Sequence, residues 1–303
     1  MKYKNIIMDR VQYEGHDYES YSLEAQKVTD VLNSGDIPEI TLAEKNVENR
    51  PVVATILAQW KNPNRAEKDY FITPFYVDAV KNAGGYPVFI AFDKIQEQLE
   101  HFNPDAILLV GGDFDFPADW YVNLDKEVSN FKRNDAYQSM LSYADKNKLP
   151  VLGICGGEQA LAGYLGAKIR TNINKDKNNI QIDHRPGGAK LIHTVSIDEN
   201  SKLFDVVKQN DFMVTSVHHE AIDKDNLGQT KAVATAPDGT VEAVEPISPW
   251  NDFVIGVQWH PERWATMDNV PSKNLFNGFI ESATLTKNRK LAQSLALKKQ
   301  MER

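Results

Sequence analysis

Short apolar runs alternate with segments of helical spacing through the first half of this chain. The apolar runs lie at residues 51–57, 87–91, 106–110 and 149–154, and the helical segments lie at residues 73–83, 94–101, 135–146 and 158–165. Strands that are apolar on both faces are typical of a parallel sheet covered by helices on both sides. The alternation therefore predicts an α/β fold around a mostly parallel sheet.

The second half of the chain has a different texture. Turn residues separate short predicted strands at residues 190–197, 212–215, 231–236, 240–245 and 253–258, and predicted helices follow at 272–283 and 287–299. Residues 113–130 are acidic and aromatic and predict a long loop. We expect a polar N-terminal extension over residues 1–49, one α/β domain over 50–285, and a basic C-terminal helix over 286–303.

Composition limits the classes of function. The net charge of −8 over 303 residues argues against a nucleic-acid partner, because binding phosphates requires clustered Lys and Arg. The single cysteine excludes an intrachain disulfide. No apolar run approaches the roughly 20 residues of a membrane span, and residues 1–24 lack the apolar core of a secretory signal. We expect a cytoplasmic protein without a membrane partner, although export by a non-standard signal would leave the same pattern.

The most informative motif is the junction between the predicted strand at 151–154 and the helix that follows it. Cys155 stands there, followed directly by Gly156 and Gly157. A strand that turns sharply into a helix at a nucleophile flanked by small residues is typical of a nucleophile elbow. The helix N-terminus favours negative charge on the sulfur. The alternative is a buried structural cysteine beside a glycine turn.

Two further strand ends carry groups that a cysteine nucleophile requires. The strand at 253–258 is followed by His260 and then by Glu262, which offer a base and a carboxylate to orient it. The strand at 106–110 is followed by Gly111 and Gly112, whose backbone N–H groups could bind an oxyanion. Alone, a histidine at a strand end is usually only a polar terminus, and a glycine pair is usually a turn.

Taken together, these motifs resemble the class I glutamine amidotransferase superfamily, and within it the γ-glutamyl-γ-aminobutyrate hydrolase (peptidase) group. The pattern Gly-x-Cys-x-Gly-x-Gln and the pattern Gly-Val-Gln-Trp-His-Pro-Glu occur at residues 153–159 and 256–262. Three further segments favour the hydrolase group, at residues 75–80 with 83–88, 216–222 and 236–243, and residues 274–280 also resemble the family. The resemblance covers about residues 51–283. It implies a three-layer α/β/α, flavodoxin-like fold, with extra short strands contributed by the second half.

The resemblance also implies roles for individual residues. The catalytic triad is Cys155 as nucleophile, His260 as base and Glu262 as the group that orients it. The oxyanion hole is formed by the N–H groups of Gly112 and Gly156. The residues near the bound γ-glutamyl group are Gln159, Ser216, Val217 and His218. The implied reaction is hydrolysis of a small γ-glutamyl amide, such as γ-glutamyl-GABA, through a γ-glutamyl thioester, without a cofactor.

The chain departs from the family pattern at three positions near the expected pocket. Gly156 stands where arginine is frequent, Phe114 where aspartate is frequent, and Ala162 where asparagine is common. These changes leave the identity of the leaving amine open. The remaining histidines indicate no metal site, because His218 and His219 are adjacent while His184 and His193 lie elsewhere in the sequence.

Two other functions remain open from sequence. The chain could be the glutaminase subunit of an amidotransferase that delivers ammonia to a separate synthase, or a non-catalytic binding relative that has kept the motif. Formation of a homo-oligomer is also left open. The C-terminal basic segment could dock on a partner or a membrane surface, but we favour a solvated last helix that packs by one apolar edge.

Overall fold

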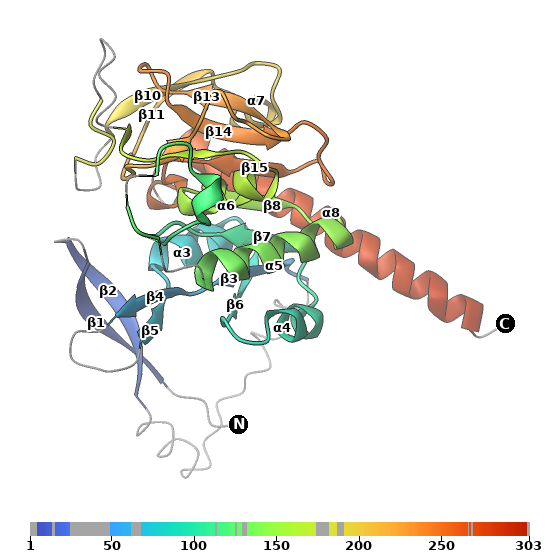
Figure 1. The fold of residues 1–303 in the computed structure, drawn as a ribbon. Coiled ribbons are helices and arrows are strands. Elements are labelled where there is room, and N and C mark those ends of the chain that lie inside the picture. The colour runs from blue at the N-terminus through green and yellow to red at the C-terminus, as the bar shows by residue number, and fades with distance from the viewer. Residues whose placement is uncertain are drawn as a thin grey trace.

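The computed structural model describes residues 5–13, 16–24, 49–61, 68–112, 114–124, 126–128, 132–173, 182–186, 191–265, 267 and 269–301. A nine-stranded sheet forms the centre of the molecule (Figure 1), with strand order β11-β10-β13-β14-β15-β8-β7-β3-β6. In that order the strands are Asp211–Val214, His193–Ile197, Thr230–Thr235, Val241–Pro246, Val254–Val257, Val151–Ile154, Ala106–Leu109, Val52–Ile56 and Tyr86–Ile90.

The sheet has two halves of opposite character. Strands β15, β8, β7, β3 and β6 are parallel to one another. Strands β11, β10, β13 and β14 are antiparallel and extend the same sheet beyond β15. Figure 1 shows this antiparallel half above the parallel half. The apolar runs of the first half thus form the parallel strands, and the short strands of the second half add the antiparallel edge, as predicted.

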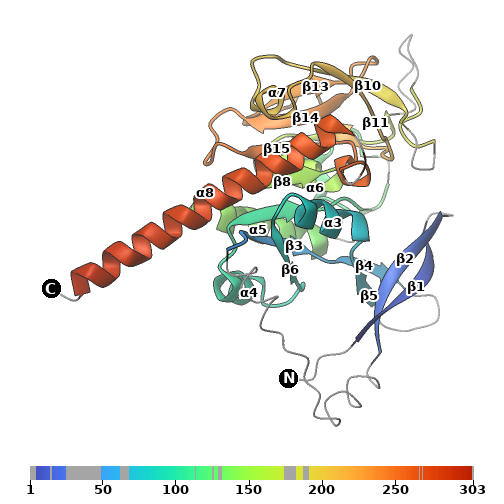
Figure 2. The same ribbon diagram turned by 180° about the vertical axis from the view of Figure 1, so that it is seen from behind.

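Helices cover both faces of the sheet. The helices are α3 (Pro74–Asn82), α4 (Ile95–Phe102), α5 (Lys132–Asn147), α6 (Gly156–Tyr164), α7 (Lys202–Val207) and α8 (Val270–Met301). One apolar core packs against α3, α7 and α8, and the other packs against α4, α5 and α6. Figures 1 and 2 show these two sets from opposite sides. The predicted three-layer α/β/α class is confirmed.

Successive residues of a strand supply the two cores in turn. Along β7, Ala106 and Leu108 belong to the core under α3, α7 and α8, whereas Ile107 and Leu109 belong to the core under α4, α5 and α6. All four side chains are 0–1% exposed. This alternation explains the continuous apolar run in the sequence, because both sides of the strand are covered.

The end of the chain differs from the prediction of two helices at 272–283 and 287–299. The structure has one continuous helix, α8. No Gly or Pro interrupts residues 284–286, and the hydroxyl of Thr284 donates to the carbonyl of Ile280 at 2.8 Å, a bond compatible with an unbroken helix. The C-terminal part of α8 projects away from the body (Figure 2). Leu291, Leu295 and Leu297 are all more than half exposed there, so the expected packing by one apolar edge is wrong.

Several short elements were not predicted. They are the pairs β1–β2 (Asn5–Tyr13, His16–Glu24), β4–β5 (Ala58–Lys61, Lys68–Phe71) and β9–β12 (Ile169–Arg170, Ala221–Ile222), the helix α7, and the single turns η1 (Ala118–Trp120) and η3 (Pro261–Arg263). The start of the predicted strand at 190–197 lies outside the described residues. Within the described part of the chain, none of the helices combines the length and apolar character that crossing a bilayer requires.

Candidate active site

Cys155 lies at the turn between strand β8 and helix α6. Its backbone has φ 53° and ψ −113°, a positive φ that is uncommon for a residue with a side chain. The chain reverses here within a single residue, which is the strained turn expected of a nucleophile elbow. The turn needs its glycine neighbour: a Cβ on Gly157 would overlap the carbonyl oxygen of Leu109 on the adjacent strand.

His260 reaches Cys155 because their strands are parallel neighbours. Strands β15 and β8 pair in register from Val254↔Val151 to Val257↔Ile154, and the N–H of Cys155 donates to the carbonyl of Val257 at 2.8 Å. The chain then leaves β15 and places His260 beside the cysteine. A Cβ built on Gly111 would lie 3.1 Å from both Cys155 Cβ and His260 Cε1. The glycine after β7 therefore leaves room for both side chains.

Glu262 orients the imidazole. The single turn η3 brings this carboxylate back toward the ring, and His260 Nδ1 lies 2.7 Å from Glu262 Oε1. Both side chains are buried, at 7% and 2% exposure. Because Nδ1 is held by the carboxylate, Nε2 is the ring nitrogen left for the sulfur.

The electrostatics of the triad favour a charged histidine. Burial by itself lowers the pKa of His260, but the negative charges of Glu262 and Cys155, together with hydrogen bonds to both, raise it to about 9. A protonated imidazole at neutral pH stabilises a thiolate next to it. The arrangement thus places a positively charged imidazole beside the sulfur of Cys155.

The two predicted oxyanion-hole residues lie side by side. A Cβ on Gly156 would be 3.1 Å from the carbonyl oxygen of Gly112, which itself has φ 142°. The N–H of Gly156 belongs to the first turn of α6, where backbone donors have no partner within the helix. The N–H of Gly111, in contrast, donates to the hydroxyl of Tyr76 at 3.0 Å. The structure therefore brings Gly112 and Gly156 together beside Cys155, and leaves Gly111 engaged elsewhere.

Two departures from the family pattern fit each other. A Cβ on Gly156 would lie 2.7 Å from Cε1 of Phe114, so the aromatic ring takes the space of a side chain at position 156. The guanidinium of Arg133, from α5, lies 5.0 Å from the centroid of the Phe114 ring. Arg133 also donates to the carbonyls of Val110 and Gly111 at 3.0 and 2.6 Å. A buried arginine thus supports the loop after β7, which no sequence motif indicated.

The third departure, Ala162, is fully buried in α6 and lies among apolar side chains.

The predicted substrate-binding residues are held by other protein groups. The side-chain amide of Gln159 donates to the carbonyl of Glu220 at 2.9 Å and to Gln258 Oε1 at 2.8 Å. Ser216 donates to the carbonyl of His184 at 2.9 Å, and Val217 is half-buried. These contacts give Gln159 and Ser216 positioning roles within the protein, and contact with a substrate stays a prediction.

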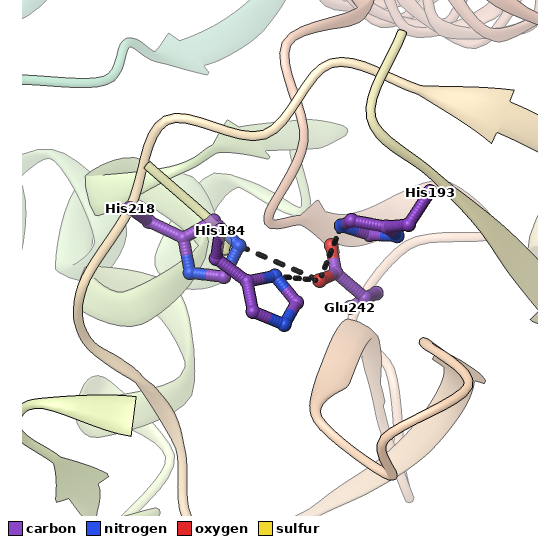
Figure 3. A group of neighbouring side chains, drawn as sticks. All are labelled: His184, His193, His218 and Glu242. Atoms are coloured by element: carbon purple, nitrogen blue, oxygen red, sulfur yellow. Dashed lines mark ion pairs between the residues drawn. The ribbon is translucent and has the colours of Figure 1, made fainter. Parts of the chain in front are cut away.

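His218, the fourth predicted substrate residue, belongs to a separate buried group. Its imidazole lies with His184, His193 and Glu242 in the antiparallel half of the sheet, and among the residues that the structure describes these four form a group that could hold a metal ion. Figure 3 shows the three rings arranged around the carboxylate. The sequence spacing gave no indication of this group, because its members come from four separate segments.

Glu158 lies between the two groups. It follows the two glycines after Cys155, is fully buried, and its Cγ lies 2.6 Å from where a Cβ on Gly256 would be. Burial raises the pKa of Glu158 well above its usual value, and the negative charges of Glu242 and Cys155 raise it further. Both effects favour the protonated, uncharged form of this carboxyl next to the nucleophile.

Comparisons with known proteins identify the family of the chain. The family model described as Peptidase C26 matches residues 51–262. A Schizosaccharomyces pombe protein named "Putative glutamine amidotransferase" is 34% identical over 212 residues, which are 68% of this chain and 79% of that protein. A Rickettsia prowazekii protein named "Putative glutamine amidotransferase-like protein" is 30% identical over 71% of this chain and 89% of its own length.

Solved structures show the same fold. The glutaminase domain of a Trypanosoma brucei CTPS superposes with a TM-score of 0.53 at 17% identity and covers 77% of this chain and 93% of that domain. A Thermoplasma acidophilum protein described as a "putative gmp synthase subunit a protein" superposes with a TM-score of 0.51, also at 17% identity; the match covers 80% of this chain and 98% of that chain. The chain therefore belongs to the Peptidase C26 family of class I glutamine amidotransferase-like proteins, and is a hydrolase of that type.

Proposed function

We propose that this protein hydrolyses γ-glutamyl amides of small amines, with Cys155 as nucleophile, His260 as acid and base, and Glu262 as its positioning partner. The observation that carries the proposal is the position of Cys155, on a strained turn, beside an imidazole that Glu262 holds by a 2.7 Å hydrogen bond, at the carboxyl ends of two parallel strands. This is where an α/β fold exposes reactive groups to a substrate.

The proposed reaction begins with attack of the Cys155 thiolate on the γ-carbonyl carbon of the substrate. The carbonyl π electrons move to oxygen, and the N–H groups of Gly112 and Gly156 stabilise the oxyanion. Losing one donor of this kind typically costs about 3 kcal/mol of barrier. Protonated His260 then gives its proton to the departing amine as the C–N bond breaks, which leaves a γ-glutamyl thioester on Cys155.

Water completes the cycle. Neutral His260 takes a proton from a water molecule as its oxygen attacks the thioester carbonyl, and the collapse of the second tetrahedral intermediate releases glutamate and the thiolate. Glu262 stabilises the imidazolium in each half-reaction without accepting the proton itself. The small space between Gly156 and Phe114 lies next to the nucleophile and would limit the size or shape of the leaving amine.

A second candidate function is that of a glutaminase supplying ammonia to a synthase. It is favoured by relatives such as the Clostridium perfringens GMP synthase, which is 25% identical over 66% of this chain but only 32% of its own length. The larger part of that relative has no counterpart in this alignment, so such a role would need a separate partner. The third candidate, a non-catalytic binding relative, is disfavoured by the ordered triad.

A panel of γ-glutamyl amides distinguishes these functions. The isolated protein is assayed for release of amine from γ-glutamyl-GABA and other γ-glutamyl amines, and for release of ammonia from glutamine. We expect hydrolysis of at least one γ-glutamyl amine that is faster than hydrolysis of glutamine. Glutaminase activity alone would favour the role of supplying a synthase. Cys155→Ala serves as the control, and turnover by that variant would contradict the mechanism.

Cytoplasmic location, oligomeric state and the limits of the three segments 1–49, 50–285 and 286–303 stay predictions.

A further inference from the structure

Four buried side chains form a compact group in the antiparallel half of the sheet. His184 lies in the segment 182–186, His193 begins β10, His218 follows β11, and Glu242 lies on β14. One potential ligand atom from each lies within 4.8 Å of the others. The exposed fractions are 1%, 5%, 4% and 0%, so the group is shielded from solvent. Figure 3 shows the three imidazoles directed toward the carboxylate.

The distances to the carboxylate are the same for all three rings. His184 Nδ1, His193 Nε2 and His218 Nε2 each lie 3.4 Å from Glu242 Oε1. Ligands bound at about 2.0–2.1 Å at the corners of a tetrahedron lie roughly 3.4 Å apart. The spacing between each nitrogen and the carboxylate oxygen therefore fits the edge of a zinc coordination tetrahedron.

The second nitrogen of each ring is held by an outer partner. His193 Nδ1 lies 3.0 Å from the carbonyl of Thr194, and His218 Nδ1 lies 3.0 Å from the carbonyl of Glu220. An N–H facing each carbonyl leaves the lone pair of Nε2 directed into the group. His184 uses the opposite nitrogens, with Nε2 held 2.8 Å from Asp238 Oδ2 and Nδ1 directed inward. Metal-binding histidines are oriented in this way by carbonyls and carboxylates.

The inner atoms of His193, His218 and Glu242 lack other partners. Within the described part of the chain, His193 Nε2, His218 Nε2 and both carboxylate oxygens of Glu242 are buried and make no hydrogen bond. The Ser216 hydroxyl lies at the margin, 3.2 Å from His184 Nδ1, and donates to the carbonyl of His184. Buried polar atoms without partners are rare in folded proteins, so each requires an explanation. A single cation between these atoms would satisfy all of them.

The charges also suit a divalent ion. Because imidazoles bind a metal in their neutral form, the Glu242 carboxylate would supply one negative charge to the ion, and Asp238 a second through His184. The set of three nitrogens and one oxygen matches the preference of Zn²⁺ for histidine and carboxylate ligands. Four protein ligands leave no open coordination position, which is typical of structural rather than catalytic sites.

We propose that His184, His193, His218 and Glu242 bind one Zn²⁺ ion, which fixes β10, β14 and the segment after β11 to one another. The site does not depend on the proposed hydrolytic function. It connects to the active site only indirectly, because the segment after β11 also supplies the Glu220 carbonyl that holds Gln159 of α6. The ion thus has a structural role in the antiparallel half.

Metal analysis of the full-length protein tests the proposal. The protein is purified without a metal-affinity tag, depleted with a chelator, and titrated with Zn²⁺ alone or Co²⁺ alone. We expect one bound Zn²⁺ per chain by elemental mass spectrometry, a higher melting temperature with Zn²⁺, and the intense visible absorption of tetrahedral Co²⁺. Folded wild-type protein that binds less than a tenth of an equivalent of either ion would overturn the site. Such a lack of metal binding is the result expected if a shared proton, instead of a metal ion, holds the four side chains together.

Variants separate this site from other places where a metal could bind. His193→Gln and Glu242→Gln should abolish the Co²⁺ spectrum, and Asp238→Asn should weaken binding by about 10–100-fold through the outer shell. His219→Gln is the matched control, because its side chain is 38% exposed and its Nε2 lies 3.9 Å from Glu220 instead of facing the group. Cys155→Ser should bind metal normally, and loss of the ion in that variant would assign it to the triad instead. If the Gln variants fail to fold, Asp238→Asn and the wild-type spectrum still decide the question.

Discussion

The two buried groups of reactive side chains in this protein lie in different halves of one sheet and were not equally visible in the sequence. The triad lies at the carboxyl ends of parallel strands, where β15 and β8 place His260 beside Cys155. The histidine group lies among antiparallel strands and connecting segments. Parallel strands bring the residues that follow them to one edge, so a motif after each strand predicts proximity. Antiparallel connections give no comparable rule, and only the folded chain brings His184 next to His218.

The largest expected effect is a loss of hydrolysis on a substitution in the triad, outside the histidine group. Cys155→Ala removes the nucleophile, and we expect the rate of γ-glutamyl amide hydrolysis to fall by about 10⁴-fold or more. The change deletes one sulfur atom from a side chain that is 9% exposed, so the melting temperature should stay close to that of the wild type. Steady-state kinetics and thermal unfolding check both halves of this statement. A large loss of stability would mean that Cys155 also has a structural role.

Glu262→Gln tests the electrostatics of the triad and should lower kcat by about 10²–10⁴-fold. The negative charge of Glu262 helps to raise the pKa of His260 to about 9. The protonated imidazole of His260 is present below that pH and is lost as the pH rises through about 9. We therefore expect wild-type activity to decline above about pH 9.

In Glu262→Gln the missing charge lowers the pKa of His260, so this decline should move to lower pH. The measurement is kcat/KM against pH, together with the rate of alkylation of Cys155. A profile that keeps the same descending limb in the variant would show that Glu262 does not set the charge of His260.

A pair of glycine substitutions compares the backbone of the two halves. Gly157→Ala places a methyl group against the carbonyl of Leu109 in the parallel half, and we expect a loss of about 3 kcal/mol in the free energy of unfolding. Gly239→Ala is the control in the turn between β13 and β14, with φ 83° and no atom within 4 Å of the new Cβ. Only the strain of an alanine at positive φ contributes there, and we expect a loss of about 1 kcal/mol in the free energy of unfolding. Equal losses in denaturant unfolding would contradict the close approach at Gly157.

The smallest effect concerns the space beside the nucleophile. Gly156→Ala brings a methyl group within 2.7 Å of the Phe114 ring, and we expect a roughly 10-fold fall in kcat/KM as the turn shifts. Removing the ring in the double variant Gly156→Ala with Phe114→Ala should restore part of the activity, with Phe114→Ala alone as reference. Additive losses in this double-mutant cycle would show that the two positions act independently.

Much of the parallel half was predictable because its strands are apolar on both faces. The run at 106–110 and the run ending at Ile154 became β7 and β8 within a residue or two of their expected limits. The continuous helix α8 was not predicted, since residues 284–286, Thr-Leu-Thr, were left between two predicted helices although no Gly or Pro stops the helix there. Arg133 was missed because it lies on α5, with no motif around it, and reaches the loop after β7 only in the folded protein.

The sequence by itself determined the elbow at Cys155, the neighbouring histidine and carboxylate, and the parallel sheet that brings them together. These are local signals, in which a strand, a glycine turn and a helix follow one another within about ten residues. Only the tertiary structure decided that Phe114 fills the space beside Gly156, and that three histidines from separate segments surround Glu242. Such contacts depend on how distant segments pack, and packing over long separations leaves no period or spacing in the chain.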